Sequence, residues 1–195
     1  MISELEKYCT QLLSAGKCAQ LPFHNIEHTK EVVSNVKVIC NYQRLSKEEI
    51  EPIVIAAWFH DTGHLELYQG HEEVSKRLAK EFLEKQGYPQ AKLETVLACI
   101  EATKMPQNCT SKYAAVLCDA DIFHIGTPDF FFKKLLLRRE WDLKDIMKVS
   151  DIEWHKLNLK FLHDHHFRTA YGKEILERGK LENEEKVKYI LGFCE

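Results

Sequence analysis

Apolar residues recur along most of this chain with the three- and four-residue spacing of an amphipathic helix. One such stripe covers 25–42, another covers about 71–86 and stops at Gly87, and the next begins at Pro89. The alternation of apolar and polar residues that is typical of strands does not extend over a useful length anywhere in the sequence. The pattern therefore predicts an all-α protein.

Capping and helix-breaking residues predict where the remaining helices begin and end. Ser46 followed by Glu49 forms a capping box, so a helix should begin there, bend or start late at Pro52, and stop at Gly63. A buried helix is predicted from 112 to 126, where a glycine stops it. Further helices are expected over the ranges 128–139, 142–171 and 182–193, and the sequence leaves the internal breaks of these ranges open.

Length and composition fit one globular domain over residues 1–195. Apolar residues make up 45% of the chain and charged residues 29%, which is enough for a core and a solvated surface. The net charge of −3 lacks the basic excess of proteins that bind nucleic acids or membrane surfaces, so neither partner is expected.

The cysteines and the N-terminus predict the compartment. Seven cysteines, an odd number without a CxxC motif, favour a reducing environment over a disulfide scaffold. The start MISELEKYCTQLL lacks the cationic and apolar regions of a signal peptide. No stretch approaches the ~20 apolar residues that cross a bilayer. We therefore expect a cytoplasmic protein without a membrane segment.

Histidines and carboxylates gather beside the apolar runs. The segment FHNIEH at 23–28 places His24 and His28 four residues apart, which on a helix is one face. The segment AAWFHDTGH ends an apolar run with the adjacent pair His60 and Asp61. Imidazole and carboxylate together form a borderline ligand set, which suits Zn, Mn, Fe or Mg better than copper or an iron–sulfur cluster.

The segment CDAD adds two acids inside an apolar helix. Asp121 falls on one helical stripe with Ala114, Leu117 and Ile125, while Asp119 lies among other apolar residues. A buried carboxylate without a partner is costly, and a metal ion removes that cost. Either acid is therefore a candidate ligand.

The order of a His, a His-Asp doublet and a distal Asp resembles the HD-domain superfamily of metal-dependent phosphohydrolases. The resemblance covers about residues 20–130, which would form the core of the domain, and about 131–195 would be a C-terminal helical extension. The family binds a divalent metal ion, and the resemblance implies that its ligands here are His28, His60, Asp61 and Asp121, with Asp119 as second choice for the last. The sequence does not distinguish Mn, Mg, Zn, Fe and Ni.

Finer likenesses assign further roles. FHNIEHT is similar to the YHNxxHA segment of cyclic-nucleotide phosphodiesterases, with Phe for Tyr, which makes His24 the acid that protonates a leaving oxygen. HDTGH resembles HDxxHPG, which matches His64, although the Pro is missing. GHEEVS resembles an acid-bearing segment that orders water near a second metal, which implicates His71 and Glu72 in substrate binding. Because CIEATK lacks the His of several two-metal branches, we expect one tight metal and at most a weaker second one.

A phosphohydrolase also needs positive charge beside its substrate. Lys104, between the fourth helix and CDAD, is a candidate for neutralising a phosphate in binding and catalysis, and a solvated loop lysine is an equal alternative. The hypothesis is thus hydrolysis of a nucleotide or related phosphate ester, with a small-molecule phosphate as the partner and the oligomeric state open.

Two other functions remain open from the sequence. HNIEH fits the H-x-x-E-H pattern of a zinc metallopeptidase, with Glu27 as the base, but that interpretation leaves His60, Asp61 and Asp121 without a role. A non-catalytic nucleotide-binding HD domain would keep the same residues. The hypotheses can be separated by variants: a peptidase should lose activity in Glu27→Gln, whereas an HD hydrolase should keep most of it.

Overall fold

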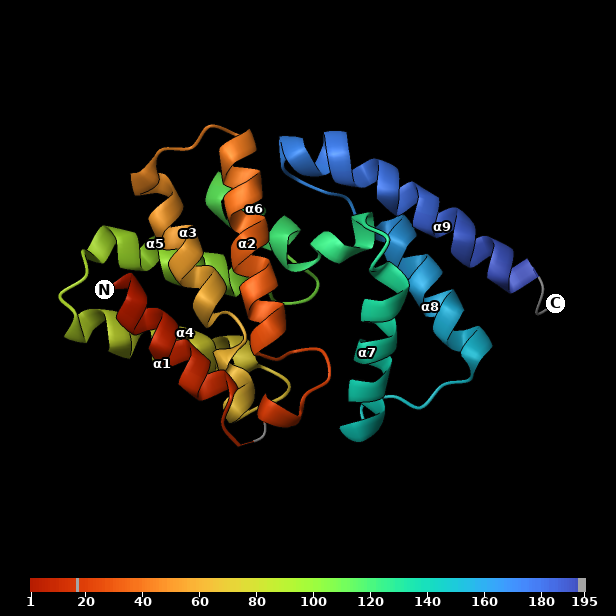
Figure 1. Cartoon of the computed structure of the whole chain (residues 1–195), viewed down its shortest axis with the longest axis horizontal. Helices are drawn as coiled ribbons and strands as arrows, with labels where there is room; N and C mark the ends of the chain where they lie inside the picture. Colours follow the sequence, from red (N-terminus) through yellow and green to blue (C-terminus); the bar gives the residue numbers. More distant parts are fainter. Residues whose placement is uncertain (17, 193–195) are drawn as a thin grey trace. The chain divides into compact units, whose positions relative to one another are not determined.

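The computed structural model describes residues 1–16 and 18–192, and every regular element in them is a helix (Figure 1). The all-α prediction is therefore confirmed. The chain divides into two compact units, Met1–Asp121 and Ile122–Glu195, which are described separately below. The predicted single domain with a core at about 20–130 stays a prediction.

The unit Met1–Asp121 is a bundle built around one apolar helix. Its α-helices are α1 (Ile2–Leu13), α2 (Ile26–Tyr42), α3 (Lys47–Phe59), α4 (His71–Lys85), α5 (Gln90–Ala102) and α6 (Lys112–Asp121). Every residue of α3 from Pro52 to Phe59 is buried, because α1, α2, α4, α5 and α6 all pack against this helix. Figure 1 shows α2 and α3 side by side, so that residues at their ends can meet.

The predicted start of α3 agrees with the structure, but its predicted end does not. The capping box of Ser46 and Glu49 is present, and Pro52 lies inside the helix without ending it. The helix stops at Phe59, however, not at the predicted Gly63, and a 3-10 turn over Thr62–Leu65 follows. A contact from another helix accounts for the early end: the Ser75 hydroxyl of α4 donates a hydrogen bond to the carbonyl of His60, the residue after Phe59 (2.7 Å).

The predicted helix over 112–126 also ends early. α6 stops at Asp121, and a separate 3-10 turn covers Phe123–Gly126. Two carbonyls in the last turn of α6 accept hydrogen bonds from side-chain amides, that of Cys118 from Gln107 (3.2 Å) and that of Ala120 from Asn35 (3.1 Å). Those carbonyls are thereby satisfied without a further turn of α-helix.

The unit Ile122–Glu195 contains the C-terminal helices. They are α7 (Phe130–Leu143), α8 (Asp151–Asp164), a π-helical turn (Gly172–Leu176) and α9 (Glu177–Gly192). The structure supplies the internal break that the sequence left open over 142–171: α7 ends at Leu143, and a capping box of Ser150 and Glu153 starts α8. The helix α1 was not predicted, and the predicted end at 193 lies outside the described residues.

Two sequence expectations about the environment can be compared with the structure. The cysteines of the described chain are free, and most are buried, whereas Cys194 lies outside the described residues. Across residues 1–16 and 18–192, no helix combines the length and the apolarity that spanning a membrane requires.

Candidate metal centre

His28 lies in the first turn of α2, and Asn25 fixes that turn. The Asn25 side chain caps the helix by accepting hydrogen bonds from the backbone N–H groups of Glu27 (2.9 Å) and His28 (3.2 Å). Its amide also donates to the carbonyls of Leu21 (3.0 Å) and Pro22 (3.1 Å), which holds the preceding loop. One residue thus orients the whole HNIEH segment.

His60 and Asp61 lie directly after α3, in a turn clamped by α4. Ser75 donates to the His60 carbonyl (2.7 Å) and accepts from the Gly63 N–H (2.8 Å), and all these groups are buried. A Cβ atom at Gly63 would lie 1.9 Å from the His71 carbonyl oxygen, so only glycine permits this close approach. The sequence HDTG therefore folds into a rigid turn that aims both side chains.

A backbone hydrogen bond fixes the tautomer of His60. Its Nδ1 lies 2.8 Å from the carbonyl oxygen of Ala57, and because a carbonyl only accepts, Nδ1 carries the hydrogen. In the neutral ring, Nε2 is then an acceptor, and it faces Asp61 Oδ2 at 3.2 Å and Asp121 Oδ1 at 3.7 Å. Both Nε2 of His60 and Oδ2 of Asp61 are buried without a hydrogen-bond partner among the described residues.

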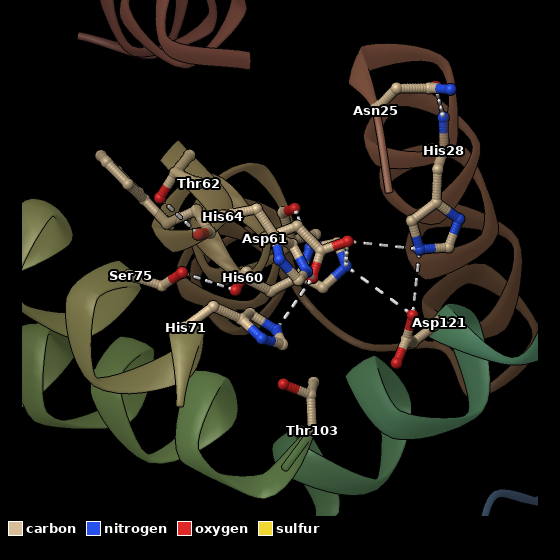
Figure 2. A network of polar contacts seen from close by, with 12 residues as sticks. Asn25, His28, His60, Asp61, Thr62, His64, His71, Ser75, Thr103 and Asp121 are labelled. Atoms are coloured by element: carbon tan, nitrogen blue, oxygen red, sulfur yellow. Dashed lines mark hydrogen bonds and ion pairs between the residues drawn. The ribbon is translucent and has the colours of Figure 1, made fainter. Parts of the chain in front are cut away.

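His28 completes the group from the other side. Its Nε2 lies 3.1 Å from Asp121 Oδ1 and 3.6 Å from Asp61 Oδ2. Figure 2 shows His28, His60, Asp61 and Asp121 pointing toward one another from α2, the turn after α3, and α6. The four side chains that the sequence pattern selected therefore converge in space, and the ligand atoms of three of them, His28, His60 and Asp121, all lie within 4.8 Å of one another.

The electrostatics of this group favour a positive charge at its centre. Burial by itself would lower the pKa of His60, but the Asp61 and Asp121 carboxylates outweigh burial and raise that pKa well above its usual value. Burial by itself would raise the pKa of Asp61, yet the neighbouring imidazoles hold it well below the ordinary range. The pKa of Asp121 is lowered in the same way by His28 and His60.

This donor set fits a divalent metal ion. An acceptor nitrogen that faces carboxylate oxygens at 3.2 Å and 3.7 Å is repulsive unless a cation or proton lies between them. Two imidazoles and two carboxylates are ligands that Zn²⁺, Mn²⁺, Fe²⁺ and Mg²⁺ accept. His28, His60, Asp61 and Asp121 would hold the ion.

A second group of histidines lies on the opposite side of Asp61. Asp61 Oδ1 is 3.4 Å from His71 Nε2 and 3.9 Å from His64 Nε2. His71 Nδ1 donates to the Tyr68 carbonyl (3.1 Å), so its Nε2 faces the carboxylate in the same way as that of His60. The ring of His24 lies 4.7 Å from that of His64, and His24, Asp61 and His64 form another set whose ligand atoms lie within 4.8 Å of one another.

His64 is the most confined member of this second group. It is 4% exposed, its ring stacks on that of His71 at 3.8 Å, and both of its ring nitrogens are buried without a hydrogen-bond partner in the part of the chain that the structure describes. Burial and the neighbouring His24 lower its pKa well below the usual value, so the ring is neutral and its lone pair is available. Asp61 thus stands between two sets of imidazoles, with one oxygen toward each.

The comparisons with known proteins agree with this geometry. A family model described as "HD domain" matches residues 25–126, which is more than half of the chain. The chain belongs to the HD-domain family. Its match spans all four converging side chains, and HD domains are metal-dependent, which supports a metal-dependent hydrolase in general.

A solved structure shows the same fold beyond the matched region. The crystal structure of a predicted HD superfamily hydrolase from an uncultured Thermotogales bacterium aligns with a TM-score of 0.64, over 100% of this chain and 93% of that one. At 20% sequence identity, the likeness concerns the fold. A search of curated proteins found no match to this HD domain.

The remaining candidates from the sequence lie at different distances from the ligand group. Glu72 is buried, with Oε1 3.8 Å from His71 Nε2, so it borders the second group. Asp119 is fully buried in α6, whereas Asp121 is the acid that faces the histidines. Lys104 is exposed, and its role at the substrate stays a prediction.

Sequence reasoning missed the residues that hold the ligands in place. Ser75 and Gln107 contact the ligand-bearing segments from α4 and from the loop before α6. Ser75 ends the GHEEVS segment and Gln107 lies in the loop before α6, but their roles were not visible in the sequence, because each contacts a ligand-bearing segment through the packing of the bundle. The cap residue Asn25 was missed as well, although Asn before a helical stripe is a local signal that could have found it.

Proposed function

We propose that this HD domain hydrolyses a phosphate ester, a nucleotide or related small molecule, with the help of a divalent metal ion. The observation that supports this proposal is the convergence of two imidazoles and two carboxylates whose acceptor atoms face one another at 3.1–3.7 Å. A bound divalent ion supplies Lewis acidity and lowers the pKa of a coordinated water toward ~7. The substrate would be a phosphomonoester or a phosphodiester.

The residues of the chain supply orientation and protons. The Ala57 carbonyl keeps the Nδ1 hydrogen of His60 away from the site, so that Nε2 stays available as a ligand. His24 is half-buried, with its ring centroid 5.9 Å from that of His28, and this position supports its proposed role as the proton donor to the leaving oxygen. Asp61 serves as a ligand with Oδ2 and leaves Oδ1 to the second group.

A second, weaker cation belongs to the same proposal. It would use the Oδ1 side of Asp61 together with His64 and His24. In that state a ring nitrogen of His24 would bind the cation and could not hold the proton for the leaving group. Occupancy of the second group would then reduce the supply of protons to the first, and excess metal is expected to inhibit turnover.

The peptidase alternative has less support. Glu27, which the H-x-x-E-H pattern would use as a base, has a side chain that is 70% exposed and paired with Lys30 at 2.9 Å. His24 and His28 also fall into different ligand sets. Glu27 thus lies outside both groups, and it offers a matched control for variants of the site.

The test compares Asp61→Ala with Glu27→Gln. Purified proteins are analysed for bound metal by elemental analysis and then assayed with a panel of nucleotide mono-, di- and triphosphates and phosphodiesters. We expect Asp61→Ala to lose bound metal and to lower turnover by at least about 100-fold, since even partners of ligands contribute 10–100-fold. Glu27→Gln should keep both properties.

The outcomes separate the competing functions. Retained turnover in Asp61→Ala would refute the metal site. Loss of activity in Glu27→Gln, with cleavage of peptides by the unmodified protein, would favour the peptidase. Binding of a nucleotide by the metal-loaded protein without any product would identify a non-catalytic domain.

A further inference from the structure

The two carboxylate oxygens of Asp121 have different surroundings. Oδ1 faces the imidazoles of His28 (3.1 Å) and His60 (3.7 Å). Oδ2 is directed toward the side-chain amide of Gln107, whose Nε2 lies 3.5 Å away. The same Nε2 donates to the carbonyl of Cys118 at 3.2 Å. An amide group carries two hydrogens, so one nitrogen serves both acceptors.

Gln107 reaches Asp121 from outside the ligand helices. It is half-buried in the loop between α5 and α6, and its side chain contacts the last turn of α6. On another side of this turn, Asn35 of α2 donates to the Ala120 carbonyl at 3.1 Å. Two amides thus hold the end of α6, and of these two that of Gln107 also lies beside the Asp121 carboxylate.

We propose that Gln107 is a positioning residue that holds Oδ2 of Asp121 and leaves Oδ1 as the sole oxygen offered to the metal. A carboxylate ligand can bind a cation through one oxygen or through two. Engagement of Oδ2 by an N–H donor favours the first mode, which leaves a coordination position for the water that attacks. This inference rests on the proposed metal-dependent hydrolysis and names a residue that the family pattern does not contain.

A purely structural role for Gln107 makes a different prediction. If the amide only satisfies the Cys118 carbonyl, its loss should lower the melting temperature of the metal-free protein and leave the metal site unchanged. If it also holds the carboxylate, its loss should change metal affinity and the ligand geometry of the ion. The discriminating measurements are therefore made on the metal, not on turnover alone.

The experiment uses Gln107→Met, which keeps the length of the side chain without any hydrogen-bond donor, and Gln107→Ala, which removes the side chain without overfilling the site. Asn108→Ala, an exposed neighbour in the same loop, is the matched control. Full-length proteins are stripped of metal, and Mn²⁺ binding is measured by calorimetry. The visible spectrum of the Co²⁺ form then reports the coordination number.

We expect both Gln107 variants to bind Mn²⁺ about 10- to 100-fold more weakly, as is typical when a partner of a ligand is removed. Their Co²⁺ spectra should shift as Oδ2 of Asp121 turns toward the ion, and Asn108→Ala should match the unmodified protein in both measurements. Unchanged affinity and spectrum in either folded Gln107 variant would overturn the inference alone. Absence of metal binding by the unmodified protein would overturn the proposed function as well.

Discussion

At the residue scale, the histidines of this site are defined by the hydrogen bonds on their far sides. His60 and His71 each give their Nδ1 hydrogen to a backbone carbonyl three residues earlier, at 2.8 Å and 3.1 Å. Both Nε2 atoms therefore face the same carboxylate, one toward each oxygen of Asp61. Backbone geometry, not the carboxylate, sets the tautomer, so a cation or a proton is needed between each Nε2 and the carboxylate.

The close packing of Gly63 beside the site predicts that one added methyl group destabilises the protein. In Gly63→Ala the added Cβ would meet the His71 carbonyl at 1.9 Å and the Ser75 backbone nitrogen at 2.9 Å. Backbone atoms cannot yield cheaply, so we expect a loss of about 3 kcal/mol or more in the free energy of unfolding. Urea denaturation followed by circular dichroism measures this loss.

The control is Gly192→Ala, because a Cβ at that position meets nothing within 4 Å. Its unfolding free energy should change by no more than about 0.5 kcal/mol. Equal stability of the two variants would show that the turn after α3 can move away from α4, which contradicts the clamp formed by Ser75.

Single residues also mark the limit of what the sequence could predict about the site. The order of His28, His60 with Asp61, and a CDAD acid is a local pattern, and it selected side chains that the fold does bring together. Helical periodicity left both Asp119 and Asp121 as candidates, since both positions touch apolar stripes, and the preference for Asp121 came from the family resemblance. The role of Gln107 could not be predicted from the sequence, because its contact with Asp121 depends on the path of the loop between α5 and α6.

At the element scale, the start of a helix is easier to predict from the sequence than its end. The capping boxes at Ser46 and Ser150 are local hydrogen-bond patterns, and both exist in the structure, although the second was overlooked. The ends of α3 and α6 are set instead by side chains from other segments, namely Ser75, Asn35 and Gln107. Those ends carry the ligands, so their early stops are part of the site.

The start of α3 provides a test of how one cap ties two helices. Glu49 accepts from the Ser46 N–H (2.9 Å), and its other oxygen pairs with Lys112 of α6 (2.7 Å). The hydrogen bond from Lys112 and that from Ser46 lower the pKa of Glu49 from 4.5 to about 2. In Glu49→Gln we therefore expect a lower melting temperature at pH 7 than in the unmodified protein.

The sign of the pH dependence follows from the lowered pKa of Glu49. The folded state holds the carboxylate charged more strongly than the unfolded state does, so the stabilisation is present above pH 4.5 and is lost as the pH falls toward 2. The melting temperatures of the two proteins should converge over that window. Glu48→Gln, an exposed neighbour in the same turn, removes an equal charge and should show a smaller gap at pH 7. A gap that persists at pH 2 would contradict this account.

At the scale of the whole molecule, the proposed ligands are distributed so that a cation links distant parts of one unit. His28 and Asp121 lie 93 residues apart in sequence, with His60 and Asp61 between them, and all belong to the unit Met1–Asp121. An ion that binds this set only in the folded state adds its binding free energy to the stability of that unit. The unit Ile122–Glu195 supplies none of the four ligands.

Hydrogen exchange with mass spectrometry can measure this linkage directly. With free Mn²⁺ at 100 times its dissociation constant, the added stability is about 2.7 kcal/mol, which slows exchange of the most protected amides about 100-fold. We expect that slowing in peptides from α2, α3 and α6, and a smaller effect in peptides from α8 and α9, because only the first helices join at the ion. Asp61→Ala, which lacks the ligand that faces both groups of histidines, should show no slowing at the same Mn²⁺ concentration. Slowing confined to α8 and α9, or equal slowing in Asp61→Ala, would place the cation elsewhere and remove the physical basis of the proposed chemistry.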